Sequence, residues 1–270
     1  MRILLTGANG YVGRRLLPEL LESGHEVICC VRDANRLGID KETRKLITLW
    51  EVDFLNEPNF ESIPQNIDVA YYLIHSMSSS TTAFDDMESK TAKNFNQYMN
   101  KIQTKQVIYL SGIVNDEQLS KHLQSRKNVE EILYQGNHYL TVLRAGIIVG
   151  SGSSSFEIIR DLSEKLPVMI TPKWVLTKTQ PIAIRNVIQY LIGVIQNPDC
   201  YNQSFDIAGP DVLNYKQGLK DVIRKAPHII LLGEIRDREA METCMEAAQT
   251  GHLVLSTLHT TGAVKTIGRI

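Results

Sequence analysis

The chain has 270 residues, of which 43% are hydrophobic, with 29 Lys and Arg against 30 Asp and Glu. This length allows one large α/β domain or two smaller ones. The formal net charge of −1 argues against a nucleic acid or an anionic membrane as a partner. No apolar run approaches the length of a membrane span. We therefore expect only small-molecule partners, a substrate or a cofactor, while a homo-oligomer stays possible.

The cysteines indicate the compartment. Cys29 and Cys30 are adjacent in a predicted buried strand, whereas Cys200 and Cys244 are isolated. This is neither a disulfide framework nor a metal-ligand pattern, so we predict no metal site. The first predicted strand follows Met1 directly and leaves no room for a signal peptide. Together these features favour a reducing cytoplasm.

The first thirty-three residues predict a strand, a glycine turn, a helix and a second strand. Residues 3–5 are apolar, the glycines follow as G-x-x-G-x-x-G, and leucines then recur at helical spacing before the strand at 26–31. The start of such a helix offers unpaired N–H groups to a pyrophosphate, which glycines allow to approach. A plain structural turn is the alternative. The residues predicted to contact a dinucleotide are Thr6, Gly7, Asn9, Gly10, Tyr11, Val12 and Gly13.

The end of the second strand bears on the choice between NADP and NAD. An acidic residue there binds the adenosine ribose hydroxyls of NAD, whereas an arginine accommodates the 2′-phosphate of NADP. Arg32 precedes Asp33, and Arg14 lies at the start of the helix. We therefore predict NADP in preference to NAD. The alternatives are that Asp33 selects NAD, or that both arginines are solvated surface charges.

The motif TGANGYVG resembles the short-chain dehydrogenase/reductase superfamily in its extended or atypical branch. With the phrases YYLIHSM and LRAGIIVG, the chain is similar to NmrA-like members through about residue 215. This resemblance implies a doubly wound parallel Rossmann sheet with helices on both faces. It also implies NAD(P)(H) binding, with oxidoreductase or nucleoside-diphosphate-sugar epimerase activity. A non-catalytic NADP(H) sensor is the other function that the resemblance allows.

Two further strand ends are expected at the cofactor. In the resembling family an acidic residue after the third strand contacts the adenine amino group, and Asp53, followed by Phe54, occupies this position. Asp53 could equally cap the next turn. The fourth strand, 69–74, should direct its carboxyl end toward the cofactor crevice. We expect Leu73, Ile74 and His75 there, although a lone His after a strand is more often structural.

The catalytic residues are harder to assign. Ser111 follows the fifth strand, 107–110, where the resembling family has a serine that hydrogen-bonds the reacting oxygen. That family's Tyr-x-x-x-Lys pair corresponds here to His122-Leu-Gln-Ser-Arg126. His122 could transfer a proton and Arg126 could hold ribose hydroxyls, but Arg cannot copy the titrating ammonium of Lys. The absence of Tyr and Lys favours the plainer alternative, a solvated helix face.

The last fifty or so residues resemble a different family, the secretion and type IV pilus retraction ATPases. IILLGEIRD is similar to their Walker B strand, and Glu234 stands at the position of their catalytic glutamate. GHLVLSTLHTT is similar to their histidine box, which His252 and His259 would represent. No G-x-x-x-x-G-K-[ST] loop occurs in the chain, so we expect no ATPase activity.

We therefore divide the chain into an NAD(P)-binding domain, 1–215, and a partial ATPase-like segment, 216–270. The segment is interpreted as an inert, chimeric addition. Its predicted strand, helix and strand should dock at the periphery of the larger sheet, because alone they would bury too little apolar surface to be stable.

Overall fold

The described parts of the chain form two compact units in the computed structural model. The structure describes residues 1–75, 83–113, 121–150, 178–210, 212–214, 229–232 and 253–256. One unit comprises Met1–Ile148 with Ile182–Gly209, and the other Val149–Pro181 with Pro210–Ile270. Among the described helices, none is long and apolar enough to cross a bilayer.

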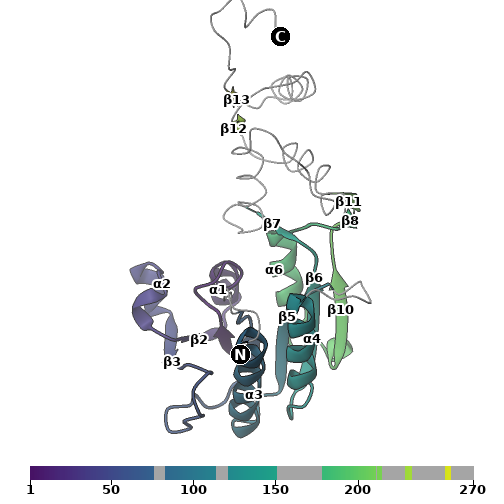
Figure 1. The fold of residues 1–270 in the computed structure, drawn as a ribbon. Helices are drawn as coiled ribbons and strands as arrows, with labels where there is room; N and C mark the ends of the chain where they lie inside the picture. Colours follow the sequence, from purple (N-terminus) through teal and green to yellow (C-terminus); the bar gives the residue numbers. More distant parts are fainter. Residues whose placement is uncertain are drawn as a thin grey trace, which may run out of the picture. The chain divides into compact units, whose positions relative to one another are not determined.

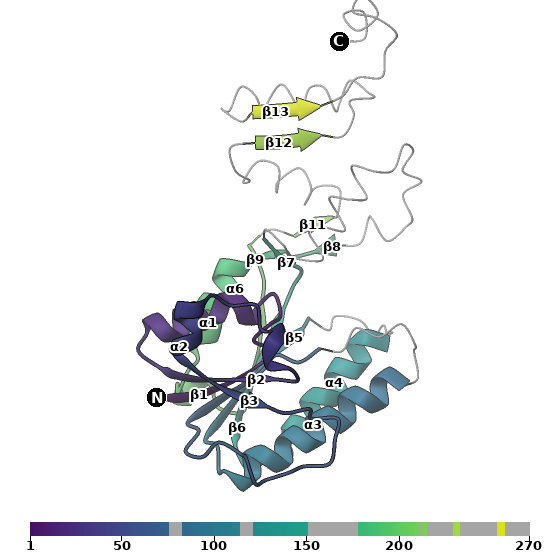
Figure 2. The same cartoon turned by 90° about the vertical axis from the view of Figure 1, so that its left-hand side faces the viewer.

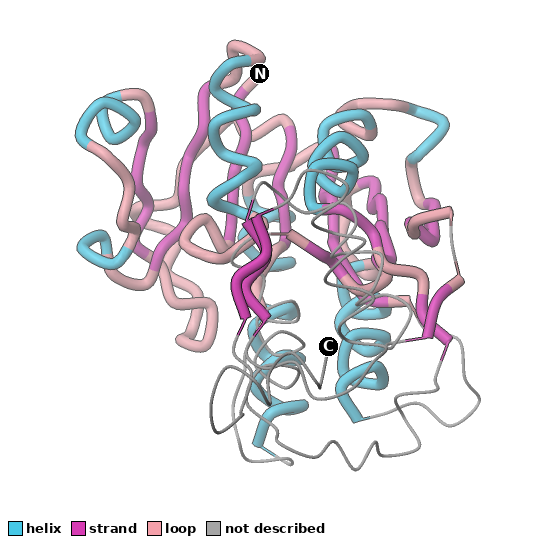
Figure 3. The backbone as a smooth tube through the Cα atoms, turned by 90° about the horizontal axis from the view of Figure 1, so that it is seen from above, coloured by secondary structure: helices cyan, strands magenta, loops and turns pink. Residues whose placement is uncertain are grey.

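The first unit is built on a seven-stranded, wholly parallel sheet in the order β10-β6-β5-β4-β1-β2-β3 (Figures 1 and 3). The strand order reverses between β1 and β4, which is the switch point where open α/β sheets bind ligands. The predicted doubly wound Rossmann sheet is thus confirmed. Its strands are β1 (Arg2–Thr6), β2 (Glu26–Val31), β3 (Ile47–Glu51), β4 (Val69–Tyr72), β5 (Gln106–Gly112), β6 (Tyr139–Ala145) and β10 (Gln203–Ile207).

Helices cover both faces of this sheet, because successive strand residues point to opposite sides. On one face, α1 (Gly13–Glu22) and α6 (Ile184–Gly193) share an apolar cluster with strand residues such as Leu5. On the other face, α3 (Ala83–Lys101) and α4 (Lys121–Leu133) share a second cluster with residues such as Leu4. Figure 2 shows the two helix pairs on opposite sides of the strands.

Two local elements differ from the predicted ones. The short helix α2 (Lys41–Lys45) lies in a predicted loop, and it forms because Asp40 caps two of its backbone N–H groups. The predicted strand 140–149 is divided: β6 pairs with β5 and β10 as far as Ala145, and Gly146 still donates its N–H to the Ile207 carbonyl of β10. The chain then continues as β7 (Ile148–Val149), paired with β9 (Ile182–Ala183). The remaining short turns are Ala34–Arg36 and Pro198–Cys200.

The described residues of the second unit include two small sheets. β8 (Lys178–Thr179) pairs antiparallel with β11 (Leu213–Asn214), and β12 (Ile229–Leu232) pairs parallel with β13 (Leu253–Ser256). The latter two are strands predicted for the ATPase-like segment. The helix predicted between them lies outside the described residues, as do Glu234, His252 and His259. Docking of this segment on the larger sheet, and the boundary at residue 215, stay predictions.

Candidate functional site

The turn after β1 brings backbone against backbone. Gly7 has φ +66°, and a Cβ on it would lie 2.6 Å from the carbonyl oxygen of Leu73. A Cβ on Gly13 would lie 2.3 Å from the Gly7 oxygen, and Gly10 donates its N–H to that same oxygen at 2.9 Å. Any side chain at Gly7 or Gly13 would therefore open the turn.

Helix α1 begins directly after this turn and leaves its positive end available. Val12 occupies the N-cap position without a side-chain cap, and the first turn holds no acidic residue. Asn9 and Gly10 are exposed beside it. A helix start of this kind stabilises a bound anion through its N–H groups and its dipole. The close-packed turn and the open helix start together fit the pyrophosphate of a dinucleotide.

Thr6 ties this turn to the neighbouring strand end. Its buried hydroxyl donates to the Tyr71 carbonyl and accepts from the Leu73 N–H, both at 2.9 Å. These two bonds fix the spacing between β1 and β4 at the switch point. Beyond them, Ile74 packs against the core and His75 is exposed.

Tyr11 is held by a cation in the first turn of α1. The Arg15 guanidinium carbon lies 3.9 Å from the centre of the Tyr11 ring, and Arg15 Nη1 donates to the Tyr11 carbonyl at 3.2 Å. Burial raises the pKa of Tyr11, against the opposing charge of Arg15. Its buried hydroxyl has no hydrogen-bond partner in the part of the chain that the structure describes. The phenol is therefore neutral, and contact of Tyr11 with a bound dinucleotide stays a prediction.

The end of β2 carries the groups predicted to choose between NADP and NAD. Arg32 is exposed, and Asp33 accepts the Asn35 N–H at 2.9 Å. Arg14 reaches the same loop, since its Nη2 would lie 3.2 Å from a Cβ on Gly38. One oxygen of Asp33 is thus engaged in capping a turn, Arg32 is exposed directly after β2, and Arg14 reaches the loop that follows, at Gly38.

Asp53 and Phe54 take different roles after β3. Asp53 accepts the Leu55 N–H at 3.0 Å, which is the turn-capping alternative expected from the sequence. The Phe54 side chain is buried and meets Trp50 and Phe95 edge to face. The Phe54 ring belongs to the core, so its buried side chain gives no support to the predicted cofactor contact. Contact between Asp53 and an adenine stays a prediction.

Ser111 lies at the end of β5 and has a partner that the sequence reasoning missed. Ser111 is 3% exposed, and its side chain hydrogen-bonds that of Tyr109, two residues earlier on the same face of the strand. Burial raises the pKa of Tyr109 to about 12, so its phenol is neutral. The Tyr109 hydroxyl also donates to the Arg126 carbonyl at 3.4 Å. The two-residue alternation of the strand was the available signal.

Helix α4 brings Arg126 toward the end of β4. Burial, together with the charge of Arg126, lowers the pKa of His75 to about 3, although His75 as a whole residue is exposed. With or without this shift, the imidazole is mainly neutral at pH 7. The backbone of His122 lies one turn before Arg126 in α4, and its side chain lies outside the described residues.

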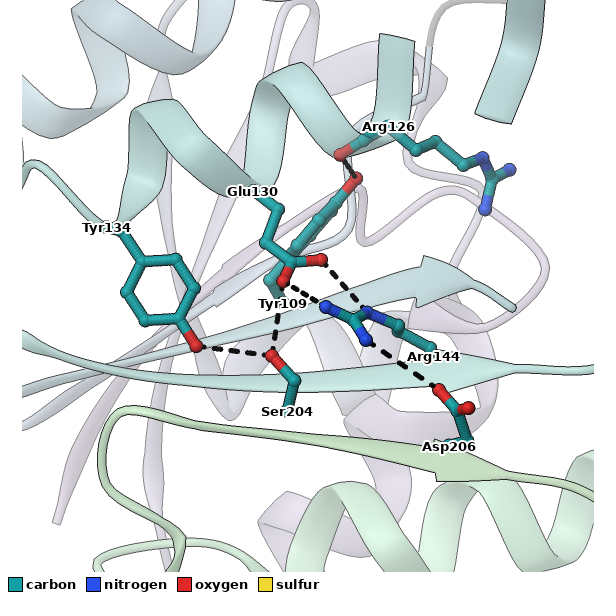
Figure 4. Close-up of polar contacts among 7 residues, drawn as sticks. All are labelled: Tyr109, Arg126, Glu130, Tyr134, Arg144, Ser204 and Asp206. Atoms are coloured by element: carbon teal, nitrogen blue, oxygen red, sulfur yellow. Dashed lines mark hydrogen bonds and ion pairs between the residues drawn. The ribbon is translucent and has the colours of Figure 1, made fainter. Parts of the chain in front are cut away.

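Glu130, one turn after Arg126, belongs to a separate network (Figure 4). Its carboxylate receives Arg144 through two hydrogen bonds of 2.6 and 3.1 Å, and it also accepts from Ser204 at 3.1 Å. Tyr134 bonds to Ser204 at 3.2 Å. Hydrogen bonding to Glu130 raises the pKa of Arg144. The network joins α4, β6 and β10 and is structural.

Metal binding has no support from the described residues, which contain no group of three or more His, Cys, Asp or Glu suited to an ion. The parallel sheet, the glycine turn and the open helix start define a Rossmann-type dinucleotide-binding protein. The family described as NAD(P)H-binding matches residues 7–167. The chain belongs to that family.

Solved structures confirm the fold. UDP-glucuronic acid 4-epimerase of Bacillus cereus, solved with NAD, is 17% identical with a TM-score of 0.66, and the match covers 84% of both chains. The yeast methylglyoxal/isovaleraldehyde reductase Gre2, solved with NADPH, is 13% identical with a TM-score of 0.69 and covers 84% of this chain and 83% of that one. The chain therefore has an NAD(P)-binding fold of the epimerase and reductase kind.

The C-terminal part matches a second family, described as type II/IV secretion system protein, over residues 199–270. The type IV pilus retractation ATPase PilT of Pseudomonas aeruginosa is 50% identical over 60 residues, or 22% of this chain and 17% of that protein. Escherichia coli YggR is 37% identical over 89 residues, 33% of this chain and 26% of that protein. The chain thus spans about a quarter or less of these relatives. The predicted ATPase fragment is confirmed as a similarity.

Proposed function

We propose that the chain is an NAD(P)(H)-dependent oxidoreductase or epimerase acting on a small substrate, with NADP as the preferred cofactor. The observation that carries this proposal is the turn at Gly7 and Gly13, which has no room for a Cβ and leads into an uncapped helix start. The preference for NADP is supported by exposed Arg32 next to the partly engaged carboxylate of Asp33, and by Arg14, which reaches Gly38 in the loop after β2.

Three residues are assigned to the reaction. A bound reduced nicotinamide would supply a hydride to a carbonyl carbon of the substrate. Ser111, whose hydroxyl donates to Tyr109 in this structure, would turn that proton toward the carbonyl oxygen of the substrate. His122 would provide the proton that this oxygen takes up, and Arg126 would orient the bound molecules from the next turn of α4.

A second function, a non-catalytic NADP(H) sensor, is favoured by one observation. The helix that follows β5 has His122 and Arg126 where a Tyr-x-x-x-Lys pair would stand. Tyr109, which contacts Ser111, is buried with a pKa of about 12, so it is poorly suited to exchange protons with a substrate. In this alternative the cofactor binds and no carbonyl compound turns over.

The remaining proposals concern partners and the C-terminal segment. We propose small-molecule partners, no nucleic acid or membrane partner, a possible homo-oligomer, and the cytoplasm as the location. Residues 216–270 would be inert, because the chain has no phosphate-binding loop of the ATPase kind.

A thermal-shift experiment with NADPH, NADH and ATP–Mg²⁺ side by side tests cofactor binding. We expect the largest stabilisation with NADPH, a smaller one with NADH and none with ATP–Mg²⁺. Arg32→Gln should reduce the difference between the stabilisation by NADPH and that by NADH. Lys41→Gln, which removes the same charge from exposed α2, should leave that difference unchanged. Stabilisation by ATP–Mg²⁺ alone would contradict the proposal.

Turnover is tested separately with NADPH and a panel of carbonyl compounds. Oxidation of NADPH by one compound, lost in Ser111→Ala and His122→Ala, supports the enzyme. NADPH binding without turnover of any compound, and without an effect of His122→Ala, supports the sensor.

A further inference from the structure

The carboxamide of Asn94 ties helix α3 to the loop that follows β3. Asn94 is 5% exposed, and its Nδ2 donates to the carbonyls of Phe54 and Asn56 at 2.8 and 2.7 Å. The amide has two protons to donate, so both are directed at the backbone of one short loop. Without these bonds the buried carbonyl of Phe54 would lose its donor away from water, which is unfavourable.

A second side chain of α3 holds the same loop. Tyr98, one turn after Asn94, accepts the Asn59 N–H at its hydroxyl at 2.8 Å. The Tyr98 ring also meets the ring of Phe60 edge to face, with 5.3 Å between their centres. The path of residues 54–60 is therefore set by contacts with α3.

This loop begins at the strand end where the adenosine of a dinucleotide is expected. β3 runs parallel to β2, and Val52 donates its N–H to the Val31 carbonyl at 2.9 Å. Asp53 and Arg32 therefore leave the sheet from adjacent strand ends. Rossmann-type sheets hold the adenosine ribose at the end of the second strand, where Arg32 and Asp33 stand.

One peptide group connects Asn94 to Asp53. The Phe54 carbonyl and the Leu55 N–H belong to the same planar group. Its oxygen accepts from Asn94, and its N–H donates to Oδ1 of Asp53 at 3.0 Å. The rotation of this peptide group is therefore fixed from the helix, and the direction of the Asp53 carboxylate is fixed with it.

We propose that Asn94 is a positioning residue for the adenosine half of the cofactor, which acts by holding this peptide group and so directing the Asp53 carboxylate toward the bound adenosine. The inference rests on the proposed function, since it requires a dinucleotide at the ends of β2 and β3. Asn94 is buried and its amide protons bond the loop, so it acts through Asp53. Its effect should be confined to the adenosine half.

Two half-ligands test this assignment by calorimetric titration of the full chain. Adenosine 2′,5′-bisphosphate represents the adenosine half of NADPH, and reduced nicotinamide mononucleotide represents the other half. Asn94→Leu removes both hydrogen bonds at similar side-chain volume. We expect it to weaken binding of adenosine 2′,5′-bisphosphate and of NADPH by about tenfold, the effect of misdirecting one hydrogen bond to a charged group. The affinity for reduced nicotinamide mononucleotide should be unchanged.

Asn96→Leu is the matched control for general loss of stability. Asn96 is also buried in α3, and its Nδ2 donates to the Ile132 carbonyl of α4 at 2.6 Å, so it does not hold the loop after β3. The affinity for adenosine 2′,5′-bisphosphate should be unchanged in this variant. Urea unfolding of both variants shows whether they lose comparable stability.

A double-mutant cycle tests the route through Asp53. Asp53→Asn should itself weaken binding of adenosine 2′,5′-bisphosphate, and Asn94→Leu should add little to that loss, because both changes act on the same contact. Tyr98→Phe, which removes only the bond to the Asn59 N–H, should weaken binding in the same direction by a smaller factor. It decides the question if Asn94→Leu does not fold.

Several results would overturn the inference. Unchanged binding of adenosine 2′,5′-bisphosphate in Asn94→Leu or in Asp53→Asn would exclude it, as would fully additive losses in the double variant. An equal loss for both half-ligands, or an equal loss in Asn96→Leu, would show that the Asn94 amide only stabilises the domain. All of these leave the proposed function intact, whereas failure of the unaltered chain to bind NADPH would refute the proposed function itself.

Discussion

Replacing Gly13 with alanine tests the dinucleotide turn directly. The new Cβ would lie 2.3 Å from the Gly7 oxygen, whereas ordinary contact begins at 3.4 Å, so the turn and helix must separate by about 1.1 Å (3.4 minus 2.3). Overpacking of this kind costs about 1–3 kcal/mol. Alanine is otherwise the better helix residue by about 1 kcal/mol, so any net loss is due to the clash.

The same displacement should weaken cofactor binding more than it weakens the fold. A shift of this size lengthens hydrogen bonds from the turn amides to a phosphate, and each charged hydrogen bond is worth about 1.5–3 kcal/mol. We expect the dissociation constant for NADPH, measured by fluorescence titration, to rise by at least about tenfold.

Gly193→Ala provides the matched control. It makes the same change in α6, where a Cβ meets nothing within 4 Å, so stability and NADPH affinity should be kept. If Gly13→Ala bound NADPH as the unaltered chain does, the turn would not be the phosphate site, and the reasoning from its close packing would be refuted.

Three further predictions concern stability in urea. Glu130→Gln should lower the unfolding free energy by about 2 kcal/mol, since Arg144 loses its ionic partner. Glu131→Gln, at an exposed residue, should change the unfolding free energy little. Equal unfolding free energies for the two variants would contradict a structural ion pair. Thr6→Val should cost about 1–3 kcal/mol by removing both of its buried hydrogen bonds, and an unchanged midpoint would count against that. Burial lowers the pKa of His138 to about 4, so the unfolded chain binds the proton more readily. The unfolding free energy should fall by up to about 3 kcal/mol as pH drops from 6.5 through 4, and His138→Gln should reduce this loss. If the variant and the unaltered chain lost stability equally over this pH range, His138 would not be the titrating group.

Much of the sheet could be predicted because its strands are short apolar runs with clear ends. β2 occupies Glu26–Val31, as expected, between Gly24 and the charged pair after Val31. The end of β6 at Ala145 was not predicted, because it is set by pairing with β5 and with β10, which is remote in sequence. Helix α2 was missed although its signal, the capping Asp40, is local.

The candidate site divides in the same way. The glycine turn was predictable because its geometry is local and demands small residues at fixed spacing. The contact of Tyr109 with Ser111 follows from the two-residue alternation of β5, but the hydrogen bond from Tyr109 to the Arg126 carbonyl connects a strand with a helix, so no spacing in the sequence indicates it. Glu130 of α4 binds Arg144 on β6 and Ser204 on β10, and only the fold reveals this structural role.

The strand β10 has a practical consequence for dissecting the chain. It is the edge strand of the seven-stranded sheet, yet Gln203–Ile207 falls inside the stretch that matches the secretion family from residue 199 onward. A chain truncated at that family border would lack Ser204, which bonds to Glu130, and Asp206, which pairs with Arg144. It would also leave the edge of β6 without its partner strand. An N-terminal fragment intended for crystallisation should therefore end beyond Gly209, where the first compact unit closes.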